Sequence, residues 1–269
     1  MLIDAAELRD RLAAGERFTL LDARDSDAWR TATLPDAHAF NVYDYFIPDS
    51  TEQEIAAMAG VFVRAWQSLG TDSATPVWFE EETGMRSPRG AWFHWLIGRD
   101  DALILNGGVR AWQEAGGELR PGRGEHTLLA PQPGADNAVR FQRERVASRE
   151  EVLRADGERT VILDARRASE HDGSFVHDCC ARAGRIPGSR LLFWEEVIAD
   201  GKFRPAAEIR AAAHKAGFSP HQRIITYCHR GARAATVYAA LKHAGFRDLA
   251  VYVGSWHEWS EHQELPVAP

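Results

Sequence analysis

The sequence has few cysteines, no long apolar run and no excess of positive charge, and each absence excludes a class of protein. Three cysteines among 269 residues cannot build a disulfide framework. Their spacing from the histidines does not predict a zinc site. No apolar segment approaches the roughly 18 residues that a membrane-spanning helix needs. A net charge of −7 argues against nucleic acid or an anionic membrane as the main partner.

The first residues also lack the pattern of a secretion signal. Met1 to Asp4 contain neither a basic start nor an apolar core, and they lead directly into a helical pattern. We therefore expect a cytoplasmic protein. The composition, 45% hydrophobic and 26% charged, is typical of a globular chain and excludes intrinsic disorder. The length favours two domains over one.

The chain contains two copies of one pattern. Each copy opens with a predicted helix cap and capping box, at Asp4–Glu7 in the first and Ser148–Glu151 in the second. A short apolar run follows and ends in the same Leu-Asp-Ala-Arg residues, at 21–24 and 163–166. Such runs are typical of buried strands in a parallel sheet. The order of these matches indicates a duplication.

The later parts of the two copies also match, since Gly107–Trp112 corresponds to Gly254–Trp259. Apolar strands alternate with helical segments in both copies, which predicts an α/β fold with two mostly parallel sheets flanked by helices. Glycine and proline cluster between the copies. We therefore expect a first domain at 1–120, a linker at 121–140 and a second domain at 141–269. The nine tryptophans are mostly expected in the core.

A cysteine in the second copy lies where parallel sheets bind ligands. The strand predicted at 224–227 leads into Cys228, and a helix is predicted over 234–241. The carboxyl end of a parallel strand and the free N–H groups of a helix start both favour an anion at this place. With Arg230 and Arg233 beside it, the sulfur should favour the thiolate form, so we interpret this cysteine as a reactive nucleophile.

Several motifs together resemble the tandem-domain rhodaneses, the thiosulfate sulfurtransferases. Gly184–Ser189 is similar to that family's Gly-His-Ile-Pro-Gly-Ala turn, with arginine in place of histidine. The other matching motifs are the Asp-x-Arg strand ends, the Gly-Ser-Trp-x-Glu-Trp segment and the loop Cys228-His229-Arg230-Gly231-Ala232-Arg233. The resemblance covers almost the whole chain. It implies two rhodanese-like domains, of which the second is catalytic and the first degenerate.

The resemblance also implies a mechanism. Cys228 would take the sulfane sulfur from thiosulfate and pass it as a persulfide to cyanide or another thiophilic acceptor. Loop N–H groups of residues 229–233 would hold the persulfide, Arg230 and Arg233 would bind the sulfonate, and His229 could add a donor. No metal or organic cofactor is expected. The partners are then a small sulfur donor and an acceptor, which could be a protein, with no nucleic acid or membrane involved.

This sequence departs from the family at two points. Vertebrate-type members have a substrate-binding arginine where Glu170 stands here, so Arg182 and Arg185 become candidate substitutes for it. The adjacent Cys179 and Cys180 match nothing in the family, and we expect ordinary loop thiols. Mercaptopyruvate-type members have an uncharged Cys-Gly-Ser-Gly loop. The charged loop of this chain therefore favours thiosulfate as the donor.

The first copy has no cysteine at the corresponding place. Its strand at 76–79 runs into three consecutive glutamates, and Glu80 occupies the position of the nucleophile. Three carboxylates should repel an anionic substrate, so we expect this copy to have a structural role. The stretch from Leu34 to Gln67 departs from the family's usual first domain, and its pattern predicts no function.

Three alternatives remain open at the level of sequence. A 3-mercaptopyruvate sulfurtransferase would use the same nucleophile with another donor. A carrier or sensing module would hold a persulfide on Cys228 without turnover. A phosphatase or arsenate reductase would have a Cys-x5-Arg loop, whereas Cys228 and Arg233 form a Cys-x4-Arg loop with less room for a tetrahedral oxyanion.

Overall fold

The chain divides into two compact units. The computed structural model describes residues 1–44, 49–71, 73–127, 129–130 and 139–269. Unit 1 comprises Met1–Phe46, Ala56–Phe141 and Asp200–Phe203, and unit 2 comprises Ile47–Ile55, Gln142–Ala199 and Arg204–Pro269. Each unit therefore includes a short segment from the other's part of the chain.

Unit 1 is built on a five-stranded sheet with strand order β1-β5-β4-β2-β3 and parallel pairing throughout. The strands are β1 (Leu2–Ile3), β2 (Phe18–Asp22), β3 (His38–Ala39), β4 (Thr75–Phe79) and β5 (Leu103–Leu105). The helices are α1 (Ala5–Ala13), α2 (Ser26–Thr31), α3 (Glu52–Gln67), α4 (Arg86–Leu96) and α5 (Gly108–Glu114). The first residues of α3, through Ile55, belong to unit 2.

Unit 2 has a second five-stranded parallel sheet, with strand order β6-β12-β11-β7-β8. Its strands are β6 (Val146–Ala147), β7 (Thr160–Asp164), β8 (Arg190–Leu191), β11 (Arg223–Tyr227) and β12 (Leu249–Tyr252). Its helices are α6 (Arg149–Leu153), α7 (Ala168–His171), α8 (Ala206–Lys215), α9 (Ala232–His243) and α10 (Ser255–Glu261). Short 3-10 turns lie at Arg143–Arg145 and Trp194–Val197, and two further short strands are β9 (Ile198–Ala199) and β10 (Lys202–Phe203).

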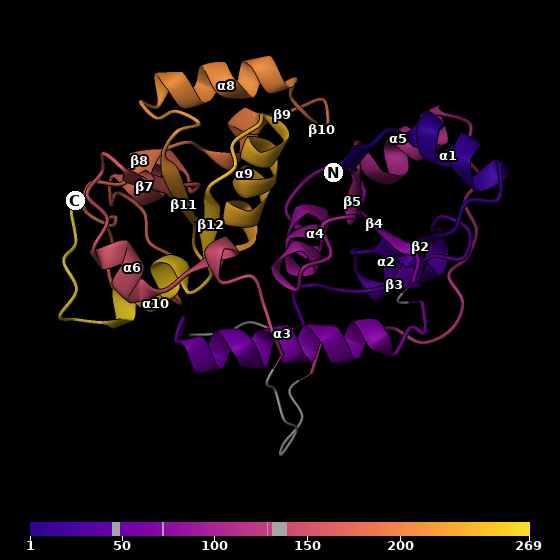
Figure 1. Ribbon diagram of the computed structural model, residues 1–269, viewed down its shortest axis with the longest axis horizontal. Helices are drawn as coiled ribbons and strands as arrows, with labels where there is room; N and C mark the ends of the chain where they lie inside the picture. The colour runs from indigo at the N-terminus through magenta and orange to yellow at the C-terminus, as the bar shows by residue number, and fades with distance from the viewer. Residues whose placement is uncertain (45–48, 72, 128, 131–138) are drawn as a thin grey trace. The chain divides into compact units, whose positions relative to one another are not determined.

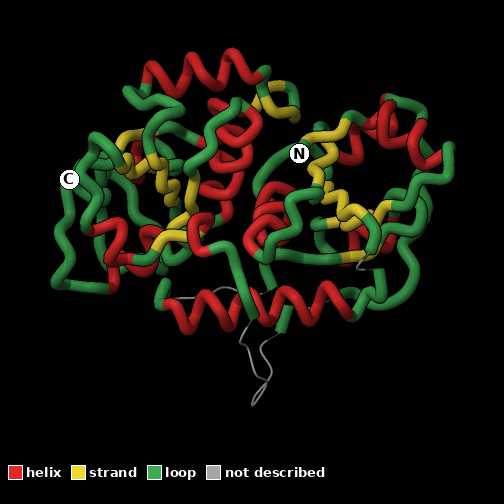
Figure 2. The backbone as a smooth tube through the Cα atoms, in the orientation of Figure 1, coloured by secondary structure: helices red, strands yellow, loops and turns green. Residues whose placement is uncertain are grey.

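The two sheets have the same topology. Strand by strand, β1, β5, β4, β2 and β3 correspond to β6, β12, β11, β7 and β8. In Figure 2 the strands of each unit form a central layer with helices around it. The predicted fold, two mostly parallel sheets flanked by helices, is confirmed.

The core of unit 2 follows the alternation of side chains along its strands. Ile225 and Tyr227 of β11 pack with Trp256 and Trp259 of α10, on one face of the sheet. On the other face, the buried Thr226 hydroxyl donates to the carbonyl oxygen of Ala234 in α9, over 3.1 Å. Figure 1 shows α9 on one side of β11 and β12, with α6 and α10 on the other. Two covered faces make β11 a rigid support for the residue that follows it.

Aromatic residues fill much of the core, as the sequence predicts. Eight of the nine tryptophans are buried. In unit 1 the Trp78 indole donates to Nδ1 of the buried His94, over 2.9 Å. Gly90 lies against the Trp78 ring so closely that an added Cβ would come within 2.3 Å of it. Close packing of this kind stabilises the fold of unit 1.

Of the two predicted capping boxes, the one at Ser148–Glu151 has its N-cap hydrogen bond. The Ser148 hydroxyl accepts a hydrogen bond from the Glu151 amide over 3.3 Å and caps α6. At α1 the prediction is wrong, because the Asp4 side chain makes no capping hydrogen bond. Asp4 still has the extended backbone of a cap residue, and its carbonyl accepts from Leu8. The helix start is therefore correct although the side-chain contact is not.

The linker predicted at 121–140 and the expected absence of a membrane-spanning helix can be compared with the described residues only. Much of the predicted linker, namely residue 128 and residues 131–138, lies outside the described residues. Arg120 forms a bridge with Thr33, and Thr127 with Phe40, so the chain around the expected end of the first domain pairs with unit 1. Within the parts of the chain that are described, no helix is long and apolar enough to cross a membrane.

Candidate active site

The predicted reactive loop lies at the centre of the unit 2 sheet. β11 has β12 on one side and β7 on the other, and Cys228 is the first residue after it. Four residues after Cys228, α9 begins at Ala232. The turn requires Gly231, whose φ of +85° is a left-handed conformation that side chains other than glycine's disfavour. The sequence therefore places a cysteine between a rigid strand and the amino end of a twelve-residue helix.

The Cys228 sulfur is buried within this loop. The residue is 1% exposed, and its Sγ accepts a hydrogen bond from the Gly231 amide over 3.1 Å. An N–H group directed at sulfur stabilises the thiolate and equally the outer negative sulfur of a persulfide. The α9 start adds its partial positive charge. The loop can therefore hold a sulfur anion away from water.

The start of α10 holds the loop from the other side. The Cys228 amide donates to the Ser255 hydroxyl over 3.2 Å, and the Cys228 carbonyl accepts from the Trp256 amide over 2.9 Å. Ser255 is buried and has a φ of +55°, which is unfavourable for a residue with a Cβ. The matching Gly-Ser-Trp segment of the sequence is thus the support of the cysteine loop.

Arg233 is ion-paired within the protein. Its two terminal nitrogens donate to the two carboxylate oxygens of Glu170, over 2.5 and 2.8 Å. Burial works against the Arg233 charge, but Glu170 and the negative charge of Cys228 raise the pKa of Arg233. Burial also disfavours ionised Glu170, yet Arg233 holds the pKa of that carboxyl below its ordinary value. The fork geometry of this pair fixes the guanidinium beside the loop.

This pairing bears on the role predicted for Arg233. Both of its terminal nitrogens donate to Glu170, and a direct contact of Arg233 with the sulfonate stays a prediction. Glu170 is therefore the partner of Arg233, a contact that no local pattern predicts because the two residues lie 63 positions apart. The positive charge near Cys228 is correspondingly smaller than two arginines suggest.

Arg182 and Arg185 make structural contacts away from the loop. The Arg182 guanidinium donates to the carbonyl oxygens of Trp259, Ser260, His262 and Leu265. Arg185 donates to the carbonyls of His171 and Pro269. Both arginines thus attach the chain after α10 to unit 2. A role of Arg182 or Arg185 in substrate binding stays a prediction.

The histidine of the loop is uncharged. Burial lowers the pKa of His229 to about 3, with the charges of nearby His177, Arg230 and Arg233 acting in the same direction. The His229 ring stacks on the His177 ring, with centroids 4.4 Å apart and planes 5° from parallel. Its Nε2 lies 3.0 Å from Sγ of Cys179. His229 therefore contacts a second thiol, and its role as a donor to the substrate stays a prediction.

The neighbouring strand end supports the loop through a buried ion pair. Asp164 at the end of β7 accepts from Arg166 over 2.8 Å and from the Tyr227 hydroxyl over 2.7 Å. His171 Nδ1 lies 2.9 Å from the same carboxylate oxygen. Burial opposes the Asp164 charge, but these partners hold its pKa below the ordinary value. The Asp-x-Arg motif is thus a structural element of the strand end.

In the first copy a carboxylate lies inside the corresponding loop. Oε1 of Glu80, the residue after β4, accepts from the amides of Gly84, Arg86 and Ser87 over 3.2, 2.9 and 2.8 Å. The Ser87 hydroxyl adds a fourth donor at 3.0 Å. The amide groups that could hold an external anion therefore hold a side chain of the protein itself.

The other two glutamates of this run are also paired. Glu81 accepts from Arg24 over 2.8 Å, and Glu82 accepts from Arg110. The expectation that three carboxylates repel an anion is therefore incomplete, since two of the charges are compensated. The third carboxylate, that of Glu80, occupies the anion position itself.

Together these features define a class: a duplicated parallel α/β protein with one buried cysteine in an amide-lined loop at a strand end. Residues 4–115 and 148–262 both match the family model described as the Rhodanese-like domain. The chain belongs to this family and carries two copies of its domain.

Known relatives support the same assignment. The thiosulfate sulfurtransferase of Azotobacter vinelandii is 28% identical over 270 residues, covering 99% of this chain and 96% of that one. The 3-mercaptopyruvate sulfurtransferase of Escherichia coli K12 is 31% identical over 211 residues, covering 77% and 73%. A solved structure of a probable thiosulfate sulfurtransferase superposes with a TM-score of 0.71 at 26% identity, covering 94% and 98%. The chain is thus a sulfurtransferase by family, while its relatives differ in sulfur donor.

Proposed function

We propose that the protein transfers sulfane sulfur from thiosulfate to a thiophilic acceptor through a persulfide on Cys228. The observation that carries this proposal is the Gly231 amide directed at Sγ of Cys228 over 3.1 Å, at the start of α9. The first domain, with Glu80 inside its own loop, has a structural role in this proposal. One nucleophile then serves the whole chain.

In the first step the Cys228 thiolate attacks the outer sulfur of thiosulfate. The new bond joins Sγ to that sulfur, the S–S bond of thiosulfate breaks, and its electron pair leaves with sulfite. The negative charge ends on the outer sulfur of the persulfide. The Gly231 amide and the partial positive charge at the start of α9 stabilise that charge.

In the second step an acceptor attacks the outer sulfur of the persulfide. With cyanide the products are thiocyanate and the Cys228 thiolate, so the enzyme returns to its first state without gaining or losing electrons. The burial of Cys228 limits this site to small reagents or to a narrow group presented by a larger acceptor. No step needs a metal ion or an organic cofactor.

Thiosulfate is the donor that the loop charge favours. It is a compact dianion, so its recognition depends on cations close to the nucleophile. Arg230 lies in the loop, and its charge reaches His229 and His257, whose pKa values it lowers together with their burial. Arg233 adds a charge that Glu170 shares. 3-Mercaptopyruvate is the second candidate donor, because several relatives of this chain are named for it.

Turnover of thiosulfate with cyanide tests the proposal. Cys228→Ser should abolish thiocyanate formation, while Cys179→Ser and Cys180→Ser retain most of it, because only Cys228 has the amide and the helix start beside it. The two serine variants of the other thiols are matched controls in the same chain. Equal losses in all three variants would contradict a single nucleophile. One round of sulfur loading without turnover would instead indicate a persulfide carrier.

A further inference from the structure

Two loops of unit 2 bring three metal-binding side chains together. Cys179 and Cys180 lie between α7 and β8, and His229 lies in the loop after β11. One ligand atom of each residue lies within 4.8 Å of the others. Cys179 Sγ and His229 Nε2 are only 3.0 Å apart. These residues are fifty positions apart in the chain, so their meeting is a property of the fold.

We propose that Cys179, Cys180 and His229 form a binding site for a soft divalent metal ion, with Zn²⁺ as the ion that fits best. Zinc binds sulfur at about 2.3 Å and imidazole nitrogen at about 2.0–2.1 Å, which puts tetrahedral ligands about 3.5–3.8 Å apart. The observed distances, 3.0 Å between Cys179 Sγ and His229 Nε2 and no more than 4.8 Å between any two of the ligand atoms, lie on either side of this range. Two thiolates with one imidazole are a soft ligand set that favours zinc over magnesium or calcium.

The neighbours of the three side chains suit such a site. The His229 ring is held by stacking on His177, and His177 Nε2 lies 3.4 Å from Oε1 of Glu170. The Cys180 amide donates to the His177 carbonyl over 2.9 Å. Support of this kind orients ligands before the ion arrives. Cys179 is exposed, so three protein ligands leave a fourth position open towards solvent.

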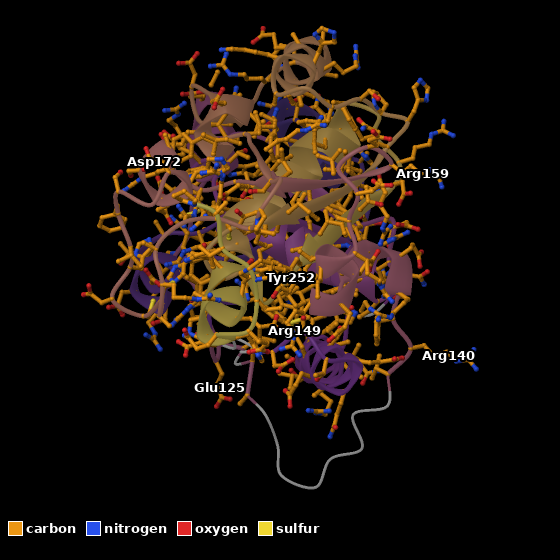
Figure 3. All side chains as sticks on the ribbon, turned by 90° about the vertical axis from the view of Figure 1, so that its left-hand side faces the viewer. Glu125, Arg140, Arg149, Arg159, Asp172 and Tyr252 are labelled. Atoms are coloured by element: carbon orange, nitrogen blue, oxygen red, sulfur yellow. The ribbon has the colours of Figure 1, made fainter. Side chains whose placement is uncertain are left out.

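Another group of ligand-type side chains in unit 2 shows the difference between such a site and an ion-pair network. Asp49, Glu258 and His262 also lie close together. There, however, the Arg149 guanidinium lies among them, 3.4 Å from Glu258 and 3.8 Å from Asp49. Arg149 is labelled in Figure 3, near Tyr252 of β12. A cation of the protein already occupies that position, whereas the close contact of Cys179 is with the neutral ring of His229.

An ion at this site would act on the reaction. His229 directly follows Cys228 in the chain, so an ion bound to its ring lies at the reactive loop. The open fourth position of zinc accepts sulfur ligands, and both thiosulfate and a persulfide are of that type. We therefore expect Zn²⁺ to inhibit sulfur transfer. This second part rests on the proposed function, whereas metal binding itself does not.

Cobalt provides a direct readout of metal binding, because Co²⁺ bound by thiolates has a strong charge-transfer absorption in the near ultraviolet. Addition of Co²⁺ to the reduced full chain should give this band with one equivalent, and Zn²⁺ should displace it. Cys179→Ser and Cys180→Ser should each lose the band and weaken Zn²⁺ binding more than about 100-fold, since even outer partners of ligands cost about 10–100-fold. Cys228→Ser is the matched control and should keep both.

The results that would overturn the site are equally specific. Absence of the thiolate band, or its loss in Cys228→Ser with retention in Cys179→Ser, excludes the proposed ligands. Circular dichroism of the variants separates ligand loss from unfolding, and the exposed Cys179 is the safer of the two changes. Inhibition is tested in Cys179→Ser, which should remain active at Zn²⁺ concentrations that inhibit the wild type. Equal inhibition of both proteins would place the ion on Cys228 and contradict the regulatory part alone.

Discussion

In the proposed mechanism, reactivity depends on how a few charges surround the sulfur atom of Cys228. Arg233 and Glu170 form a bidentate pair, and His229 is neutral, with its pKa lowered by burial to about 3. Arg230 is the other cation of the loop. Donor recognition should therefore depend more on Arg230 than the sequence suggests.

Replacement of Arg230 tests this dependence. Arg230→Ser should lower kcat/KM for thiosulfate by about 10- to 150-fold, the equivalent of a lost charge-assisted hydrogen bond of about 1.5–3 kcal/mol. The effect on 3-mercaptopyruvate should be much smaller. The measurement is kcat/KM for both donors with cyanide as the common acceptor. Arg204→Ser, which changes an exposed arginine of unit 2 outside the loop, serves as the control.

Two results of that experiment would contradict the thiosulfate assignment. One is a wild-type protein that prefers 3-mercaptopyruvate. The other is an equal loss for both donors in Arg230→Ser. In either case the charge of the loop does not set the choice of donor.

The buried pair of Glu170 and Arg233 should also stabilise the fold in a pH-dependent way. Glu170→Gln should lower the free energy of unfolding by about 1.5–3 kcal/mol at neutral pH, because one charge-assisted bond is lost. The folded-state pKa of Glu170 is lowered, so its contribution is complete above the unfolded value of about 4.3 and is lost as the pH falls below it. The difference between wild type and variant should shrink accordingly.

Denaturant unfolding at several pH values measures this difference. Glu208→Gln is the matched control, since Glu208 pairs with Arg204 at an exposed position and should contribute less than about 1 kcal/mol. A difference for Glu170→Gln that stays constant from pH 7 to acid would show that the carboxylate charge is not what stabilises the pair.

At the scale of elements, the same strand-loop-helix unit is used in two ways. In unit 2 the loop after β11 receives the sulfur of Cys228, and in unit 1 the loop after β4 receives the carboxylate of Glu80. The loop of unit 1 is longer, because α4 begins at Arg86, six residues after Glu80, whereas α9 begins four residues after Cys228. Both loops direct backbone amides at the side chain that follows the strand, one amide in unit 2 and three in unit 1.

Removal of the Glu80 carboxylate should therefore expose an anion site. Glu80→Ala leaves three amides and a hydroxyl without their acceptor and should lower the free energy of unfolding by about 2–4 kcal/mol. Sulfate should recover part of this loss, because it binds the folded variant and not the unfolded chain. Thermal unfolding in sulfate and in chloride at equal ionic strength measures the recovery.

The control for this experiment is Glu81→Ala, which removes the neighbouring exposed carboxylate but leaves the loop amides bonded. Sulfate should stabilise that variant no more than the wild type. If sulfate raises the melting temperatures of all three proteins equally, the amides after β4 do not form an anion site.

The elements around the nucleophile could be predicted from the sequence because their signals are local. The strand at Ile224–Tyr227, the turn at Gly231 and the helix that follows are contiguous and have clear periodicity. The contacts of Arg233 with Glu170 and of Cys179 with His229 could not be predicted. They join loops 63 and 50 residues apart, and the packing of the whole unit decides which loop residues meet.

At the scale of the whole molecule, duplication explains the fold more fully than any single motif. The strand orders of the two sheets are identical, and the matching sequence segments fall on matching strands and helices. Identical residues remain where a side chain supports the strand end, as in Asp22 with Arg24 and Asp164 with Arg166. The nucleophile is not among the shared residues.

This asymmetry predicts the sulfur content of the loaded protein. After incubation with thiosulfate and removal of the excess, the intact mass should increase by one sulfur atom per chain and not by two. Cyanide should return the mass to its initial value. The increase should be absent in Cys228→Ser and present in Cys179→Ser. A second stable sulfur atom, or loading in Cys228→Ser, would indicate another sulfur-accepting thiol.

Each unit contains a short segment from the other half of the chain, Ile47–Ile55 in unit 2 and Asp200–Phe203 in unit 1, so the gene cannot be divided into two complete domains. A cut between codons 141 and 142 would leave the second half without Ser50, whose hydroxyl donates to the buried Glu258 and accepts from the Arg149 amide, both over 3.0 Å. It would leave the first half without Gly201, whose carbonyl accepts from the Thr83 amide over 2.8 Å. Neither half encodes all of its own fold. A duplicated gene that has diverged in this way can no longer lose its first copy without removing part of the second unit's fold.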